Sequence, residues 1–132
     1  MATLTVTTPS GTTFTGTNTN DLILGTEDND TINGLDGDDD LRGGKGDDLL
    51  IGAGGSDKIW AQNGNDTIIG GQGNDSIAGG IGRDTVDYSN LETAITLMGW
   101  GMVAKGALGT DTLGSFSNAS ADDVIETFIG AT

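Results

Sequence analysis

The sequence contains no cysteine and no histidine, and it has one proline among 132 residues. Without cysteine it can form neither disulfides nor thiolate metal sites, and without histidine it lacks the usual ligand for zinc, copper and iron. Any metal site must therefore use carboxylate, amide or backbone carbonyl oxygens, which favour hard cations such as calcium or magnesium. The lack of histidine also removes the usual catalytic base, so we expect that the protein is not an enzyme.

Basic residues are scarce as well. Five lysine and arginine residues stand against 20 aspartate and glutamate residues, which gives a net charge of −15 at pH 7. A chain without a basic patch cannot neutralise phosphates, so we expect cations as partners and no nucleic acid. No apolar run is long enough for a transmembrane helix. Residues 1–16 lack the features of a Sec signal peptide, so we expect the protein either to stay inside the cell or to leave by another route.

Glycine, in contrast, is abundant, and its 24 residues are arranged with a period of nine. Counted from Gly16, eight nine-residue units run to the end of unit 79–87. The eighth position of every unit is isoleucine, leucine or valine, and the sixth is always aspartate. These aspartates are Asp21, Asp30, Asp39, Asp48, Asp57, Asp66, Asp75 and Asp84. The invariant residue types at positions six and eight indicate a folded repeat and not a disordered acidic tract.

Each unit predicts one short strand and one turn. Positions seven to nine form a minimal strand with the aliphatic residue on one face, and the preceding glycines allow a tight turn. Two units then make a coil of eighteen residues, and stacked coils give an all-β structure with two parallel sheets. One sheet would be lined by Ile23, Leu41, Ile59 and Ile77, and the other by Ile32, Leu50, Ile68 and Val86. A core one residue deep is too thin to hold such a coil alone.

The acids offer the missing stability. Equivalent aspartates of successive coils would stack about 4.8 Å apart, where like charges repel. A divalent cation between them reverses the sign of this interaction, and calcium also accepts the backbone carbonyls of the glycine-rich turns as ligands. The pattern therefore predicts several calcium ions between the coils.

The repeats at residues 70–78 (GGQGNDSIA) and 79–87 (GGIGRDTVD) resemble the RTX, or hemolysin-type, calcium-binding nonapeptide of bacterial proteins. The resemblance covers residues 16–87 and implies a right-handed parallel β-roll, in which sixth-position aspartates of units n and n+2 share calcium. On this chain it implies up to six Ca²⁺ sites, at Asp21–Asp39, Asp30–Asp48, Asp39–Asp57, Asp48–Asp66, Asp57–Asp75 and Asp66–Asp84. Turn carbonyls would complete the ligand shells, for example those of Gly43, Gly44, Gly46, Gly70, Gly71 and Gly73.

Some units depart from the pattern. The first two, 16–24 and 25–33, lack glycine at positions two and four, so we expect them to form the N-terminal edge and to bind less tightly. Ala53, Ala61 and Gln62 replace glycines in two later units. We expect those turns to adjust while their aspartates remain in place.

The domain organisation follows from the repeat. Residues 1–15 are expected to form an N-terminal edge segment, 16–87 the β-roll and 88–132 a C-terminal cap, because an open stack needs its last layer covered. Within the cap, residues 94–98 and 124–130 are predicted strands. Residues 114–122 are interpreted as an insertion.

The RTX resemblance implies a secreted or cell-surface module that folds when calcium binds. It also implies export by a type I system, which reads an uncleaved C-terminal signal and would explain the missing N-terminal one. Two alternatives stay open. A cytosolic calcium sensor or buffer would bind near micromolar calcium, whereas an adhesin, surface-layer or ice-binding module would show a regular row of one residue type on an outer face. The sequence identifies no protein or surface partner.

Overall fold

A computed structural model of the chain describes residues 2–5, 11, 13–91, 96–98, 102–114 and 125–129. The strands of the repeat region are β3 (Asp21–Leu24), β4 (Thr31–Asp36), β5 (Asp40–Lys45), β6 (Leu49–Gly54), β7 (Lys58–Asn63), β8 (Thr67–Gln72), β9 (Ser76–Ile81) and β10 (Asp84–Asp87). The flanking elements are β1 (Ala2–Thr5), β2 (Thr13–Thr15), β11 (Thr96–Met98), β12 (Met102–Ala104), the 3₁₀ turn η2 (Gly106–Leu108), β13 (Thr110–Leu113) and β14 (Ile125–Ile129).

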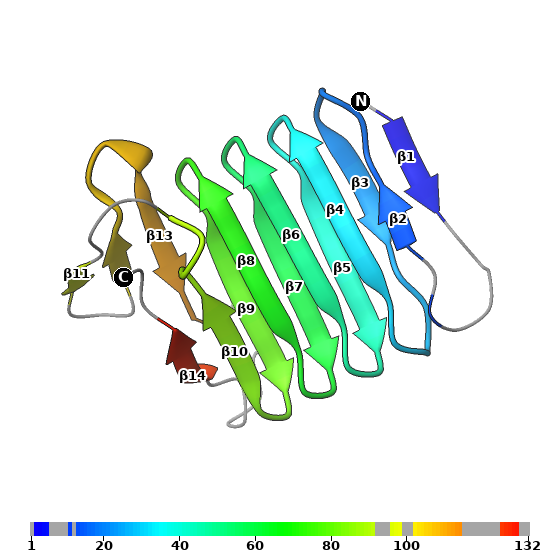
Figure 1. The fold of residues 1–132 in the computed structure, drawn as a ribbon. Coiled ribbons are helices and arrows are strands. Elements are labelled where there is room, and N and C mark those ends of the chain that lie inside the picture. Colours follow the sequence, from blue (N-terminus) through cyan, green and yellow to red (C-terminus); the bar gives the residue numbers. More distant parts are fainter. Residues whose placement is uncertain are drawn as a thin grey trace.

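The repeat strands alternate between two parallel sheets (Figure 1). One sheet has the order β1-β3-β5-β7-β9-β13-β12-β11 and the other β14-β10-β8-β6-β4-β2. Within the repeats each residue pairs with the residue eighteen positions later, as Leu41 does with Ile59 and Leu50 with Ile68. This register confirms the predicted all-β parallel roll with two units in each coil.

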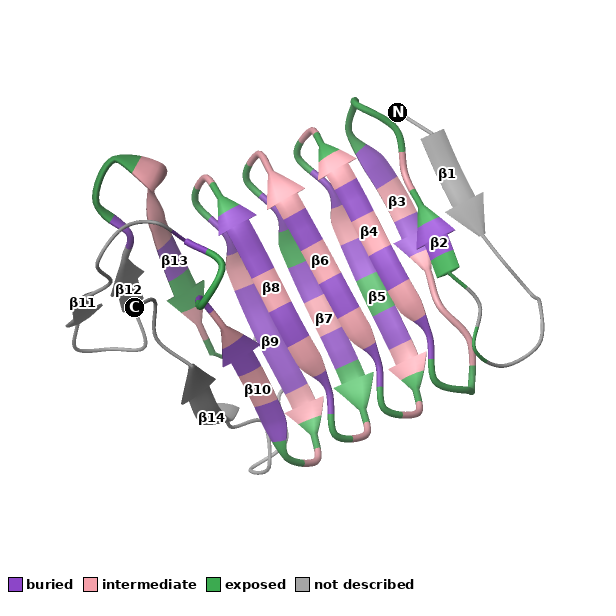
Figure 2. Ribbon diagram, in the orientation of Figure 1, coloured by how far each residue is buried: buried purple, intermediate pink, exposed green. Residues whose placement is uncertain are grey.

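The core is the double aliphatic ladder between the two sheets. The eight predicted residues, Ile23, Leu41, Ile59, Ile77, Ile32, Leu50, Ile68 and Val86, are all fully buried. Figure 2 shows the resulting bands of buried residues running across the strands. Phe14 of β2 pairs with Ile32 and extends the ladder by one layer beyond the first counted unit. Each layer adds one aliphatic residue per sheet, so this core stays thin however many coils are stacked.

The strands are longer than the sequence indicated. Most run for six residues, from position seven of one unit to position three of the next, because parallel pairing continues through the glycines. From unit 34–42 onward, the second position of the unit adopts a positive φ, which is +99° at Gly71. Ala53 and Gln62 keep the same backbone, with φ of 77° and 84°. The turns therefore do not adjust to these residues as expected, because pairing with the neighbouring coils holds the backbone in place.

Both ends of the stack carry additional strands. β1 pairs with β3 and β2 with β4, so the outermost N-terminal strands come from residues 1–15 and not from the first two units. At the other end β13 pairs in parallel with β9 and β14 with β10. The predicted strands at 94–98 and 124–130 correspond to β11 and β14, whereas β12 and β13 were not predicted. The insertion predicted at 114–122 lies outside the described residues, apart from Gly114.

In the part of the chain that the structure describes, no helix has the length and apolar character needed to cross a membrane.

Candidate metal-binding ladders

The sixth-position aspartates form two buried rows, one along each side of the roll. We call them row A, which comprises Asp21, Asp39, Asp57 and Asp75, and row B, which comprises Asp30, Asp48, Asp66 and Asp84. Each of these residues either directly precedes a strand or is its first residue, and each side chain is at most 3% exposed. Buried carboxylates are costly unless they are paired or bind a cation, so the rows require a partner.

Backbone hydrogen bonds join neighbouring members of each row. From Asp39 onward, the Oδ1 atom of each aspartate accepts a hydrogen bond from the backbone N–H of the aspartate eighteen residues earlier. The distance is 2.8 Å from Asp21 to Asp39 and 3.0 Å from Asp57 to Asp75. The same bond joins Asp30–Asp48, Asp39–Asp57, Asp48–Asp66 and Asp66–Asp84. The structure therefore brings together all six predicted pairs.

The second carboxylate oxygen has no such partner along the middle of the rows. The Oδ2 atoms of Asp39, Asp48, Asp57 and Asp66 are buried and accept no hydrogen bond. Each of these oxygens would be expected to find a donor or a cation, because an unsatisfied buried acceptor costs about 1–3 kcal/mol. These four oxygens are the atoms at which a cation would most directly satisfy the rows.

Next to the unsatisfied oxygens of Asp57 and Asp48 are small spaces that a first-position glycine leaves open. A Cβ atom placed on Gly52 would overlap Asp57 Oδ2 and lie 2.6 Å from the carbonyl oxygen of Gly70 in the next coil. At Gly43 the corresponding atoms are Asp48 Oδ2 and, again at 2.6 Å, the carbonyl oxygen of Ala61. A carboxylate oxygen and a carbonyl oxygen thus converge on each space. This oxygen donor set fits a hard divalent cation.

The acidic side chains do not suffice as ligands by themselves. Among the described residues, no three or more acidic side chains gather closely enough to hold a metal ion. A cation between two coils must therefore draw its remaining ligands from the backbone, which agrees with the carbonyl oxygens that line the spaces at Gly43 and Gly52.

Burial makes these carboxyl groups weak acids. It raises the pKa of Asp57 and of Asp66 to about 7, and the charges of the neighbouring row members add to the effect. The pKa of Asp48 rises to about 6 and that of Asp39 also rises, again chiefly through burial. The backbone N–H donors counteract only part of the shift. A divalent cation favours the charged form, so it would compete with protons for these groups.

The predicted carbonyl ligands occupy three kinds of position. The first-position oxygens of Gly43 and Gly70 lie against the first-position glycines of the preceding coil, Gly25 and Gly52. Those of the fourth-position Gly46 and Gly73 face Gly64 and Gly109. The second-position oxygen of Gly71 accepts a hydrogen bond from Lys105. Gly44 is also a second-position residue. Its φ is +118°, and a Cβ on it would overlap the carbonyl oxygen of Thr26.

One member of row A was missed by the sequence analysis. Asp111 is fully buried, and its Oδ1 atom accepts a 3.0 Å hydrogen bond from the backbone N–H of Asp75. It thereby repeats the contact that Asp75 makes with Asp57, although it lies 36 residues further along the chain. Its surroundings, residues 106–114 (GALGTDTLG), have glycine, aspartate and leucine in phase with the frame counted from Gly16. This match in the sequence indicates a ninth unit, separated from the other eight.

A second ladder, at position five, was also missed. The side-chain oxygen at this position accepts a hydrogen bond from the backbone N–H eighteen residues later, as Asn29 does from Asp47 and Asp47 from Asn65. Asp38 and Ser56 make the corresponding contacts in the other series. This ladder needs no metal, because both partners belong to the chain.

Comparison with known families agrees with this geometry. The sequence model of the RTX calcium-binding nonapeptide repeat, in its four-copy form, matches residues 15–50 and 51–86, which make up more than half of the chain. The two segments contain all eight aspartates of rows A and B that the sequence analysis identified. No curated protein matches the chain.

Proposed function

This chain belongs to the RTX calcium-binding nonapeptide-repeat family, and from that membership we propose that it is a module that folds when calcium binds between its coils. The observation that carries the proposal is the set of buried, unsatisfied Oδ2 atoms at Asp39, Asp48, Asp57 and Asp66. Each lies in a row whose members repel one another unless a cation stands between them.

The proposed ligands come from both rows. Row A supplies three sites, at Asp21–Asp39, Asp39–Asp57 and Asp57–Asp75, and row B supplies three at Asp30–Asp48, Asp48–Asp66 and Asp66–Asp84. Turn carbonyls such as those of Gly43 and Gly70 would complete the shells, with the remaining oxygens from Gly44, Gly46 and Gly73. The Gly71 oxygen is instead bonded to Lys105. The ions would supply the positive charge that the buried rows lack. The chain itself excludes water with its two sheets and fixes one oxygen of each carboxylate by a backbone hydrogen bond.

Folding and binding are then a single equilibrium. The sites exist only when coils are stacked, so the binding free energy of calcium becomes folding free energy. With 24 glycines and a charge of −15, the chain has little else to offset its conformational entropy. We place the module outside the cell or on its surface, where calcium-binding modules typically have a Kd of about 10⁻⁴–10⁻³ M, and assign its export to a type I system. A binding and structural role, not catalysis, follows from this chemistry.

The test is a calcium titration followed by far-ultraviolet circular dichroism, with magnesium as the control ion. We expect a cooperative change from coil to β structure with calcium and none with the same concentration of magnesium, which keeps its waters and demands octahedral geometry. A β spectrum that a chelator leaves unchanged would contradict the proposal. A midpoint near micromolar calcium would instead favour a cytosolic sensor.

A further inference from the structure

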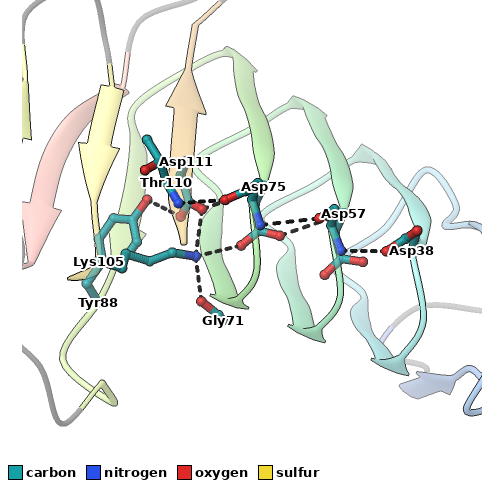
Figure 3. A network of polar contacts seen from close by, with 10 residues as sticks. Asp38, Asp57, Gly71, Asp75, Tyr88, Lys105, Thr110 and Asp111 are labelled. Atoms are coloured by element: carbon teal, nitrogen blue, oxygen red, sulfur yellow. Dashed lines mark hydrogen bonds and ion pairs between the residues drawn. The ribbon is translucent and has the colours of Figure 1, made fainter. Parts of the chain in front are cut away.

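Lys105 is fully buried at the C-terminal end of row A. Its Nζ atom donates hydrogen bonds to the carbonyl oxygen of Gly71 at 2.6 Å and to Asp75 Oδ2 at 3.0 Å. It also lies 2.6 Å from Asp111 Oδ1. Both carboxylates of this cluster are fully enclosed, and Figure 3 shows the ammonium group pointing into the space between them. The three N–H bonds of the ammonium thus meet three oxygen acceptors.

The acceptors of Lys105 are the same kinds of atom that the proposed calcium sites use. Asp75 and Asp111 are sixth-position residues of adjacent coils in row A, joined by the usual bond from backbone N–H to Oδ1. Gly71 is the second-position residue of the unit that contains Asp75. Among the other aspartates of row A, only Asp57 has a lysine next to it in the sequence. This residue, Lys58, is exposed.

The chain path explains how the ammonium reaches this rung. The nine-residue frame is interrupted over residues 88–105, and the displaced unit 106–114 resumes it with β13 paired to β9. Lys105 is the residue immediately before that unit. Its backbone N–H donates to the carbonyl of Gly109 and its carbonyl accepts from Leu108, at 2.8 and 3.2 Å, which anchors it on η2. Tyr88, fully enclosed near the other end of the excursion, donates its hydroxyl to Asp111 Oδ2 at 2.7 Å.

We propose that the ammonium group of Lys105 is a built-in cation that takes the place of calcium at the last rung of row A. Row A would then contain five aspartates and four gaps, of which three bind calcium and the fourth is closed by the chain itself. The inference rests on the proposed function, because it compares this rung with the calcium sites. It gives the cap a metal-independent contact with the end of the roll.

The first experiment counts calcium ions bound to the Lys105→Ala variant, by equilibrium dialysis and native mass spectrometry at saturating calcium. The substitution removes the ammonium and leaves the Asp75 and Asp111 carboxylates and the Gly71 carbonyl facing an open space. We expect one more calcium ion for each chain than in the wild type. Lys58→Ala, which removes the same charge from an exposed position, is the matched control and should bind the wild-type number. An unchanged number in a Lys105→Ala variant with a normal β spectrum overturns the inference.

The second experiment uses the unmodified chain and therefore does not depend on the folding of a variant. Reductive methylation at rising calcium concentrations is followed lysine by lysine. We expect Lys45 and Lys58 to react and Lys105 to become protected as the roll forms. A Lys105 that stays as reactive as Lys58, or that becomes more reactive as calcium saturates and displaces it, overturns the inference. A wild-type chain that binds no calcium contradicts the proposed function, and this inference with it, whereas a failure confined to Lys105 leaves that function intact.

Discussion

The tightest constraint on individual residues is the contact between glycines of successive coils. Gly73 has a φ of +107°, and a Cβ on it would overlap the carbonyl oxygen of Gly55 in the preceding coil. We expect Gly73→Ala to destabilise the calcium-loaded protein by about 3 kcal/mol or more, because backbone strain and steric overlap add. Gly54→Ala is the control. Its Cβ would approach only the carboxylate of Asp36, at 3.0 Å, and that side chain can move. Urea unfolding at fixed calcium measures both, and equal losses would contradict this explanation.

Ala53 shows the opposite case, an L-residue where the turn favours glycine. Its φ is 77°, a conformation that costs a side-chain-bearing residue about 1–2 kcal/mol, whereas glycine adopts it freely. The greater freedom of glycine in the unfolded chain offsets about 0.5–1 kcal/mol of that gain. We therefore expect Ala53→Gly to stabilise the protein by about 0.5–1 kcal/mol. Thermal unfolding at saturating calcium measures the change, and a lower midpoint would show that the methyl group makes a favourable contact.

The buried carboxyl groups predict how the chain responds to pH. In the folded chain burial raises the pKa of Asp57 and Asp66 from the ordinary value of 3.8 to about 7. The folded state thus binds more protons than the unfolded state between these values, and its stability without calcium falls as the pH rises through this range. In calcium-free buffer we expect more β structure at about pH 5 than at about pH 8.

Calcium-dependent folding should respond to pH in the opposite sense to calcium-free folding, because calcium binds the deprotonated carboxylates. The calcium concentration at the folding midpoint is expected to rise as the pH falls from about 7.5 to about 6. Circular dichroism at each pH measures both effects. A midpoint that does not change with pH would show that these carboxylates do not bind the ion.

At the scale of an element, each inner aspartate serves two rungs. Asp57 pairs with Asp39 on one side and Asp75 on the other. Asp57→Asn keeps the shape and one oxygen acceptor but removes the charge, so two of the proposed sites lose a carboxylate. We expect the variant to bind two fewer calcium ions at concentrations that saturate the wild type.

Asp38→Asn is the matched control for this prediction. Asp38 is exposed and lies next to row A, and asparagine occupies the same position five of its unit at Asn20 and Asn65. The variant loses the same charge but should keep the number of ions and the hydrogen bond that Ser56 donates to Oδ1. Equal losses of calcium in the two variants would mean that net charge, and not the rows, governs binding.

The elements also show where sequence reasoning reached its limit. The sheets and the aliphatic ladder could be predicted because residues equivalent to Asp57 and Ile59 recur every nine positions. This single spacing fixes the register of every coil. Position five shows no repeated residue type, because Asn29, Asp47 and Ser56 differ, although all of them offer an acceptor oxygen. The relevant property there is a hydrogen-bonding function, which a search for a repeated residue type does not detect.

The C-terminal end of row A could not be predicted for a different reason. The nine-residue pattern is absent from residues 88–105, so Asp111 is separated from the continuous repeat although it is in phase with it. The length of this excursion, two units, is visible in the sequence. Its return beside β9, and the burial of Lys105 between two carboxylates, depend on tertiary packing that no local pattern of residues specifies.

For the whole molecule, the central question is whether calcium acts as a ligand or only screens a charge of −15. The two roles differ because screening weakens repulsion between exposed charges but leaves buried carboxylates without a partner.

A random chain of 132 residues has a radius of gyration of about 37 Å, whereas a compact one has about 14 Å. Small-angle X-ray scattering should show the compact value at millimolar calcium. In calcium-free buffer with about 1 M NaCl, where the screening length is about 3 Å, we expect a partly contracted chain without β structure. A fully compact, β-rich chain in salt alone would mean that the aspartate rows need only weaker repulsion and that the oxygen-lined spaces are not calcium sites.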